Sequence, residues 1–158
     1  MSDLYAIEAA LDAEDPKRAI ALFREFGNIN DQRATILRKR LYQRFKGSKP
    51  KLCRALIGDA YDYYKKTRDK AQAFIKKEMN TTGTVPPAVL HKLMDVLGVA
   101  IASSKKFMEV FDGLVHIDEF TPNAADQAQR HEATVTLVEF QKELGRWSAI
   151  DSDTAYQA

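Results

Sequence analysis

Residues 50–78 read PKLCRALIGDAYDYYKKTRDKAQAFIKKE, and this stretch decides the fold. Its apolar side chains recur at intervals of three and four, which places them on one face of an α-helix. Proline is accepted in the first turn of a helix, so Pro50 marks the start. The sequence therefore predicts a helix of about seven turns from Pro50 to Glu78. Its predicted inward residues are Leu52, Leu56, Ala60, Tyr63, Thr67, Ala71 and Phe74.

Three shorter helices are predicted before this stretch, in residues 4–11, 16–26 and 31–46. The second is bounded at both ends, because Asp15 is a suitable N-cap before a proline and Gly27 ends the apolar pattern. The first two helices are expected to form a helical hairpin. The third shows the same spacing of apolar residues and stops at a Gly-Ser pair.

The composition changes after residue 78. Residues 79–87 contain β-branched side chains, a glycine and two prolines, which are typical of a break between helices. The next predicted helix, residues 89–115, carries apolar side chains around more than half of its circumference. Such a helix is either central in its fold or part of an oligomer interface. Gly98, or the pair Ser103 and Ser104, is where a kink or a break would be expected.

The C-terminal part completes the predicted architecture. After a turn at residues 118–123, apolar residues up to Trp147 follow helical spacing, whereas small and acidic residues in 148–158 indicate a flexible tail. We therefore expect an all-α protein, a helical bundle of about six helices. Its predicted parts are a basic N-terminal helical unit at 1–78, a linker at 79–87 and an acidic C-terminal helical unit at 88–147.

Charged residues are segregated along the chain. The 158 residues have a net charge of +2, but residues 31–77 hold 15 of the 24 basic residues and only four acidic ones, a net charge of +11. Residues 1–30 and 78–158 have net charges of −3 and −6. Charge gathered in this way usually has a partner, so the middle segment is expected to bind a polyanion or an acidic protein surface.

Helical geometry predicts that many of these cations share a surface. At about 100° per residue, three arginines of the 31–46 helix fall within about 40° of one another, and a second group follows one flank of the next helix for about 33 Å. Two lysines lie near the start of that helix, where free amide groups also favour phosphate. The predicted phosphate-binding residues are Arg33, Arg40, Arg44, Lys49, Lys51, Arg54, Lys65, Arg68 and Lys76, with Tyr61 adding a stacking or sugar contact.

The favoured function is non-catalytic nucleic-acid binding, in an accessory or regulatory role, through backbone contacts to DNA or RNA. The strongest alternative is a protein–protein adaptor or assembly protein whose basic face docks on an acidic partner. The 88–115 helix would then join copies of the chain in a homo-oligomer. A third interpretation is a solvated face, in which lysine and arginine stems cover apolar neighbours.

Motifs for catalysis are missing from the sequence. It has no glycine-rich phosphate loop, no G-x-S-x-G elbow and no two-histidine helix motif, so neither an enzyme nor a cofactor or metal is expected. Asp112 and His116, four residues apart, fit a solvated helix face better than a metal site. The single cysteine, Cys53, falls on an apolar helix face and allows no internal disulfide, which agrees with a cytoplasmic protein. The longest apolar stretch, residues 93–102, is about half of a bilayer span, so no membrane association is expected.

Overall fold

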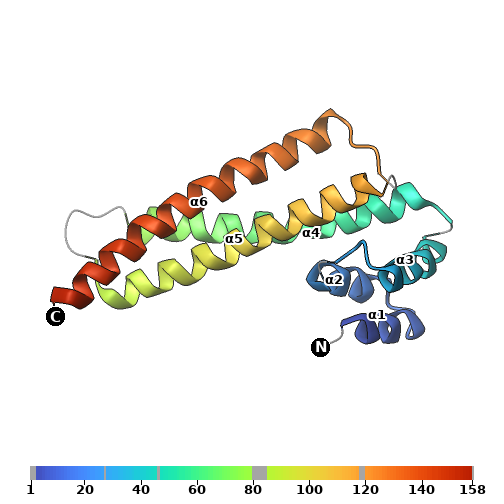
Figure 1. Ribbon diagram of the computed structural model, residues 1–158, viewed down its shortest axis with the longest axis horizontal. Helices are drawn as coiled ribbons and strands as arrows, with labels where there is room; N and C mark the ends of the chain where they lie inside the picture. Colours follow the sequence, from blue (N-terminus) through green and yellow to red (C-terminus); the bar gives the residue numbers. More distant parts are fainter. Residues whose placement is uncertain (1–2, 27, 46, 80–84, 118–119, 158) are drawn as a thin grey trace.

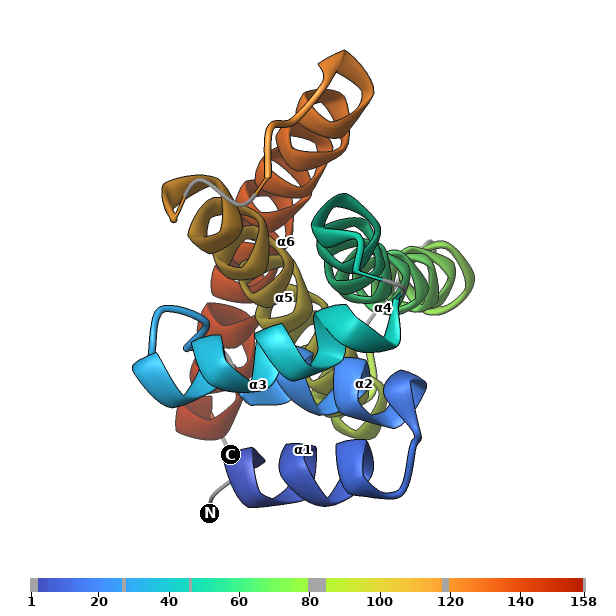
Figure 2. The ribbon, with the colours of Figure 1, turned by 90° about the vertical axis from the view of Figure 1, so that its right-hand side faces the viewer.

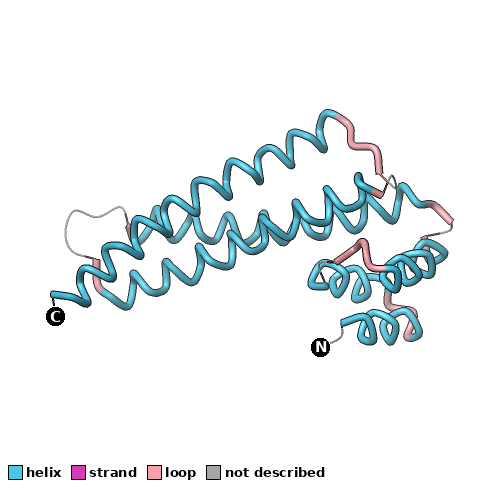
Figure 3. The backbone as a smooth tube through the Cα atoms, viewed as in Figure 1, coloured by secondary structure: helices cyan, strands magenta, loops and turns pink. Residues whose placement is uncertain are grey.

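The protein is all-α, as predicted from the sequence. The computed structural model describes residues 3–26, 28–45, 47–79, 85–117 and 120–157, with side chains described from Leu4 to Ala149 within these ranges. Over this part of the chain it contains six helices and no strand (Figures 1 and 3). Three short helices lie at one end of a bundle of three long ones. The predicted bundle of about six helices is therefore confirmed.

The three short helices are α1 (Asp3–Asp12), α2 (Pro16–Phe26) and α3 (Gln32–Arg44). Figure 1 shows them at one end of the long helices, and Figure 2 shows them grouped together when the molecule is viewed from that end. Polar side chains accept from free amide groups where two of these helices begin. The Asp15 carboxylate accepts from the Arg18 amide at 3.1 Å, and the Asp31 carboxylate accepts from the Arg33 amide at 2.8 Å. Both starts lie within one residue of the predicted positions.

The long helices are α4 (Lys49–Glu78), α5 (Pro87–His116) and α6 (Ala124–Gln157). Helix α4 agrees closely with the prediction, and it begins after Ser48, whose hydroxyl accepts from the Lys51 amide at 3.4 Å. Helices α4 and α5 run antiparallel, and α5 also packs against α6. Helix α5 is central in the fold, and its predicted role in joining copies of the chain stays a prediction.

Helix α5 is continuous at the positions where a kink was expected. Ser103 and Ser104 are buried, and both hydroxyls donate to the Ala100 carbonyl oxygen, at 3.0 and 2.9 Å. These bonds satisfy the two hydroxyls inside the helix, so no break is needed to solvate them. Gly98 also lies within the uninterrupted helix.

Two clusters of buried apolar residues share α5. The larger one joins α1–α4 to the C-terminal half of α5, and the smaller one joins Ala71 to the N-terminal half of α5 and to Phe140 of α6. Cys53 is 1% exposed in the larger cluster. Tyr63 was predicted to point inward, which is wrong: Tyr63 is 39% exposed, and its neighbour Tyr64 is fully buried. Tyr64 stacks beside Phe107, with ring centroids 6.0 Å apart.

By length and composition, α5 is the one helix in the described residues that would be able to cross a membrane. The core helices of water-soluble proteins often have the same character. Here α5 buries residues along its whole length, against α4 on one side and α6 on the other.

Helix α6 begins with a reciprocal capping box. The Asn123 side chain accepts from the Asp126 amide, and the Asp126 carboxylate accepts from the Asn123 amide, both at 2.8 Å. The helix then continues to Gln157, through most of the segment for which the sequence predicts a flexible tail. Residues 80–84 of the predicted linker lie outside the described residues, and the division into two units stays a prediction.

Candidate interaction surface

The three predicted arginines of α3 do share one flank, but this flank faces α1. Each guanidinium pairs with a carboxylate of α1 or of the turn after it, and Arg33 also lies over the ring of Tyr5 at 4.4 Å. All three arginine side chains remain partly exposed. Their positive charge is therefore balanced within the N-terminal end of the molecule. The ion pairs are Arg33–Glu8 at 3.4 Å, Arg40–Asp12 at 2.5 Å and Arg44–Glu14 at 3.4 Å.

The two predicted arginines of α4 bind carboxylates of α6. Arg54 makes two hydrogen bonds to Asp126, at 3.1 and 3.2 Å, in the parallel geometry that guanidinium and carboxylate groups favour. Arg68 forms ion pairs with Glu132 and with Asp69. These polar contacts join α4 to α6 directly. The close packing of both helices is mainly against α5.

Tyr61 belongs to the same connection between α4 and α6. Its hydroxyl donates to the Glu132 carboxylate at 3.3 Å, and its ring packs beside those of Tyr64 and Phe107, with centroids 5.7 and 5.3 Å away. Tyr61 is half-buried, so these contacts occupy part of the side chain that was predicted to stack on a base or contact a sugar. Burial raises the pKa of the Tyr61 hydroxyl above its usual value of 10.0, and the charge of Arg68 opposes this effect.

Asp126 is the best-connected carboxylate of this region. Its side chain is 10% exposed, and it accepts from both Arg54 and the Asn123 amide. Burial alone would raise the pKa of Asp126, but these hydrogen bonds bring that pKa below its usual value of 3.8. Asp126 thus closes the first turn of α6 and fixes that turn to α4.

The predicted lysines are placed differently from the arginines. Lys49, Lys51, Lys65 and Lys76 are exposed, and within the described ranges none of them forms an ion pair. Three further lysines of α4 share this character, namely Lys66, Lys70 and Lys77. Two of the three aspartates of α4 are paired with arginines instead. The unbalanced positive charge of α4 is therefore carried by lysine.

A groove between α4 and α5 adds apolar surface to these lysines. It consists of two adjoining hollows of about 290 and 420 Å³, which share Tyr63 and Val99 in their linings. Both side chains are unusually exposed for their type, at 39% and 48%. The larger hollow is bordered by lysines of both helices and by one aspartate. These charged residues are Lys66, Lys70, Lys92 and Asp95.

The α2 end of this groove holds a partly buried ion pair. Arg24 of α2 lies 3.6 Å from the Asp59 carboxylate and 4.2 Å from the centre of the Tyr63 ring. Burial raises the pKa of Asp59 above its usual value of 3.8, and the charge of Arg24 offsets only part of this effect. Arg24 and Glu25 line the smaller hollow, so α2 borders the groove at that end.

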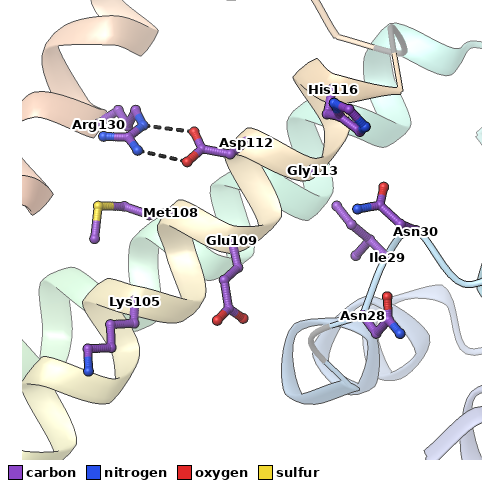
Figure 4. Close-up of a pocket in the computed structure, with 10 residues that line it drawn as sticks. All are labelled: Asn28, Ile29, Asn30, Lys105, Met108, Glu109, Asp112, Gly113, His116 and Arg130. Carbon is purple, nitrogen blue, oxygen red and sulfur yellow. Dashed lines mark hydrogen bonds and ion pairs between the residues drawn. The ribbon is translucent and has the colours of Figure 1, made fainter.

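A separate open pocket of about 540 Å³ lies between α5, α6 and the segment after α2 (Figure 4). Arg130 holds Asp112 with two hydrogen bonds, at 2.8 and 2.7 Å, so this carboxylate is already engaged. Lys105 and Glu109 add one positive and one negative charge, so the charged side chains that line the pocket have no net charge. His116 lies at the edge of this pocket. In the part of the chain that the structure describes, no three metal-binding side chains come together.

Comparisons with protein-family models, with curated proteins and with solved structures found no match. The surface must therefore be interpreted from its own residues. Sequence reasoning missed the groove because it placed Tyr63 in the core and did not single out Val99 among the apolar residues of the predicted 89–115 helix. The available signal was the lysine pattern, since Lys66 and Lys70 are four apart on α4 and share a face.

Proposed function

We propose that this protein is a non-catalytic adaptor, which binds an acidic surface of a partner protein through the lysines of α4. The observation that carries this proposal is the division between the two kinds of cation. Within the described residues, the arginines of the predicted site are paired with carboxylates, while the lysines of α4 form no ion pair. A surface of unpaired lysines attracts an acidic partner and raises the rate of association.

Two features favour a protein partner over a nucleic acid. Arginine is the better residue for binding phosphate with two hydrogen bonds, and the arginines here are occupied by carboxylates. The exposed apolar side chains of Tyr63 and Val99 lie beside the free lysines Lys66 and Lys70. Aromatic and apolar groups surrounded by charge are typical of protein interfaces.

Nucleic-acid binding remains the second candidate, and one observation favours it. The exposed lysines extend from Lys49 in the first turn of α4 to Lys77 in the last, which is about 42 Å of helix. A row of this length would allow several phosphate contacts to DNA or RNA. It would not give base-specific recognition.

A pair of measurements separates the two candidates. In the first, a phage-displayed library of random 18-residue peptides is selected on the full-length chain, and we expect the enriched peptides to be rich in Asp and Glu. In the second, fluorescence polarisation measures binding of mixed-sequence duplex DNA, single-stranded DNA and RNA at about 50 and 200 mM salt.

We expect nucleic-acid affinity to be negligible at both salt concentrations. Strong binding at low salt that falls steeply at high salt, together with no enrichment of acidic peptides, would replace the adaptor by a nucleic-acid-binding protein. Charge reversal of at least one lysine pair on α4 should weaken peptide binding without loss of helical content, as followed by circular dichroism.

A further inference from the structure

The groove between α4 and α5 lies on the side of these helices that α6 does not cover. On α4, Tyr63 and Lys66 line the groove, whereas Arg54, Tyr61 and Arg68 form the opposite flank that contacts α6. Helix α5 is divided in the same way, because Val99 lines the groove while Asp112 pairs with Arg130 of α6. One side of the antiparallel pair is thus covered by a third helix and the other is open.

The dimensions of the groove suit a helix. Lys92 and Lys106 mark its two ends on α5, and 14 positions separate them, which is about 21 Å or four turns. Packed helices lie about 8–10 Å apart with side chains of one in the grooves of the other. A partner strand would need a sheet edge, and the described chain contains only helices. An α-helix is therefore the element that fits.

The chemistry of the groove specifies which helix it would take. Its floor is mostly apolar, formed by Tyr63, Val96, Val99 and Ala102, and the hydroxyls of Thr67 and Ser103, which also line it, hydrogen-bond to each other. At its edge Lys66 and Lys70 on α4 face Lys92 on α5, and in the described chain these lysines form no ion pair. Asp95 of α5 also borders the larger hollow, but the three lysines leave it a net positive charge. A partner whose apolar stripe is bordered by acidic residues would bury the floor and neutralise this charge.

We propose that this groove binds an acidic amphipathic α-helix of a partner protein, about four turns long. Apolar residues of that helix, spaced at three and four, pack on Tyr63 and Val99. Its aspartate and glutamate side chains pair with Lys66, Lys70 and Lys92. This is the helix-in-groove mode of recognition. The inference rests on the proposed adaptor function, and it adds the place of binding and the structure of the bound segment.

The test compares two double variants of the full-length chain. Lys66→Glu with Lys70→Glu reverses charge at the groove, and Lys65→Glu with Lys76→Glu makes the same change on the other flank of α4. Both pairs are exposed, lie on the same helix and alter the net charge equally. Acidic peptides enriched from the library are titrated against both variants and wild type. We expect the groove variant to lose about tenfold or more in affinity and the control variant to lose much less.

Two further readouts locate the bound peptide. Amide chemical shifts of the 17.9 kDa chain should change at Val96, Val99 and Ala102 when an enriched peptide is added. Val99→Glu should also weaken binding, because it puts a negative charge into the floor, where it repels the acidic peptide. Val99 is 48% exposed, so the substitution should leave folding unchanged. The enriched sequences should show apolar residues at positions i, i+3 or i+4, and i+7.

The outcomes distinguish this inference from the function on which it rests. If acidic peptides bind the groove variant as tightly as wild type but lose affinity for the control variant, the groove is not the binding site. The proposed adaptor function would still stand. Enriched peptides that are acidic but lack apolar residues at helical spacing would refute the proposal that the bound segment is an α-helix. A library that yields no acidic peptides would overturn the adaptor function itself.

Discussion

Asp126 shows how much one side chain contributes to the position of α6. It caps the helix through Asn123 and holds Arg54 of α4. We expect Asp126→Ala to lower the free energy of unfolding by about 1–2 kcal/mol, mostly through loss of the hydrogen bond from the Asn123 amide to the Asp126 carboxylate, because Arg54 is 53% exposed and its ion pair is screened by water. Asp126→Asn keeps an oxygen for the cap and should cost less. Urea unfolding at neutral pH measures the loss of stability in both variants. Equal losses would show that the capping hydrogen bond is not the main contribution of Asp126.

The pH dependence of stability should differ in sign between Asp126 and Asp59. The pKa of Asp126 is lowered in the folded protein, so its contribution is present above its unfolded pKa and is lost as pH falls below about 3.8 towards the folded value. The pKa of Asp59 is raised, so ionisation of this carboxyl weakens the folded state as pH rises above 3.8 through the folded value.

Urea unfolding at pH 7 and pH 3 tests this contrast with two substitutions. Asp126→Asn should be less stable than wild type at pH 7, and the difference should shrink at pH 3. Asp59→Asn should be more stable than wild type at pH 7 and nearly equal to it at pH 3. If both variants changed in the same direction with pH, the opposite environments of the two carboxyls would be refuted.

Periodicity predicted which residues face the core more reliably than it predicted partners. Leu52, Leu56 and Ala60 are buried as expected, because helical spacing depends only on neighbouring residues. Which of Tyr63 and Tyr64 is buried depends on where α2 and α5 lie, and local spacing carries no information about those positions. The carboxylate that pairs with Arg54 is 72 residues away, and for the same reason the sequence did not predict it.

At the scale of helices, Ile29 packs directly over Gly113 of α5 (Figure 4). A Cβ atom at residue 113 would lie 2.3 Å from Ile29 Cδ1, and Ile29 is 3% exposed, so the isoleucine has little room to move. Alanine improves helix propensity by about 1 kcal/mol, but overpacking costs about 1–3 kcal/mol. We expect Gly113→Ala to lower the melting temperature.

A control for this substitution lies in the same helix. A Cβ at Gly98 would meet nothing within 4 Å, so Gly98→Ala should stabilise the protein by about 0.5–1 kcal/mol through propensity alone. Thermal unfolding followed by circular dichroism compares the two. A rise in melting temperature for both variants would show that the segment holding Ile29 moves aside at little cost.

Helix starts could be predicted closely because their signals are local, whereas α6 continues to Gln157, past its predicted end near Trp147. Asp15, Asp31 and Ser48 lie at helix starts, and each accepts a backbone hydrogen bond there. The continuity of α5 was harder to predict, since Ser103 and Ser104 break helices in some settings and here bond to the turn before them. The groove could not be predicted, because it depends on how α2, α4 and α5 are arranged relative to one another, and the sequence of one helix does not show this.

For the whole molecule, the distribution of charge makes a prediction about nucleic acid. The α3 arginines are neutralised by Glu8, Asp12 and Glu14. A triple variant, Glu8→Gln with Asp12→Asn and Glu14→Gln, should therefore bind duplex DNA more tightly than wild type at low salt. The reason is that three guanidinium groups are released on one flank of α3. Fluorescence polarisation with mixed-sequence duplex measures the change.

The matched control removes the same number of negative charges at other exposed positions. It combines Asp62→Asn, Asp95→Asn and Glu139→Gln, so both variants raise the net charge from +2 to +5. A gain confined to the first variant would show that α1 masks a phosphate-binding ridge. Equal affinity of the two variants would mean that total charge, and not the pairing with α1, controls binding to DNA.

The burial of Cys53 has a practical consequence for spectroscopy. This thiol is the only sulfhydryl of the chain and is 1% exposed, so a maleimide dye has little access to it in the native state. A cysteine engineered at any surface position would then take up the fluorophore alone, without prior removal of the natural thiol. Distances between such labels would be measurable by energy transfer in an otherwise unaltered molecule.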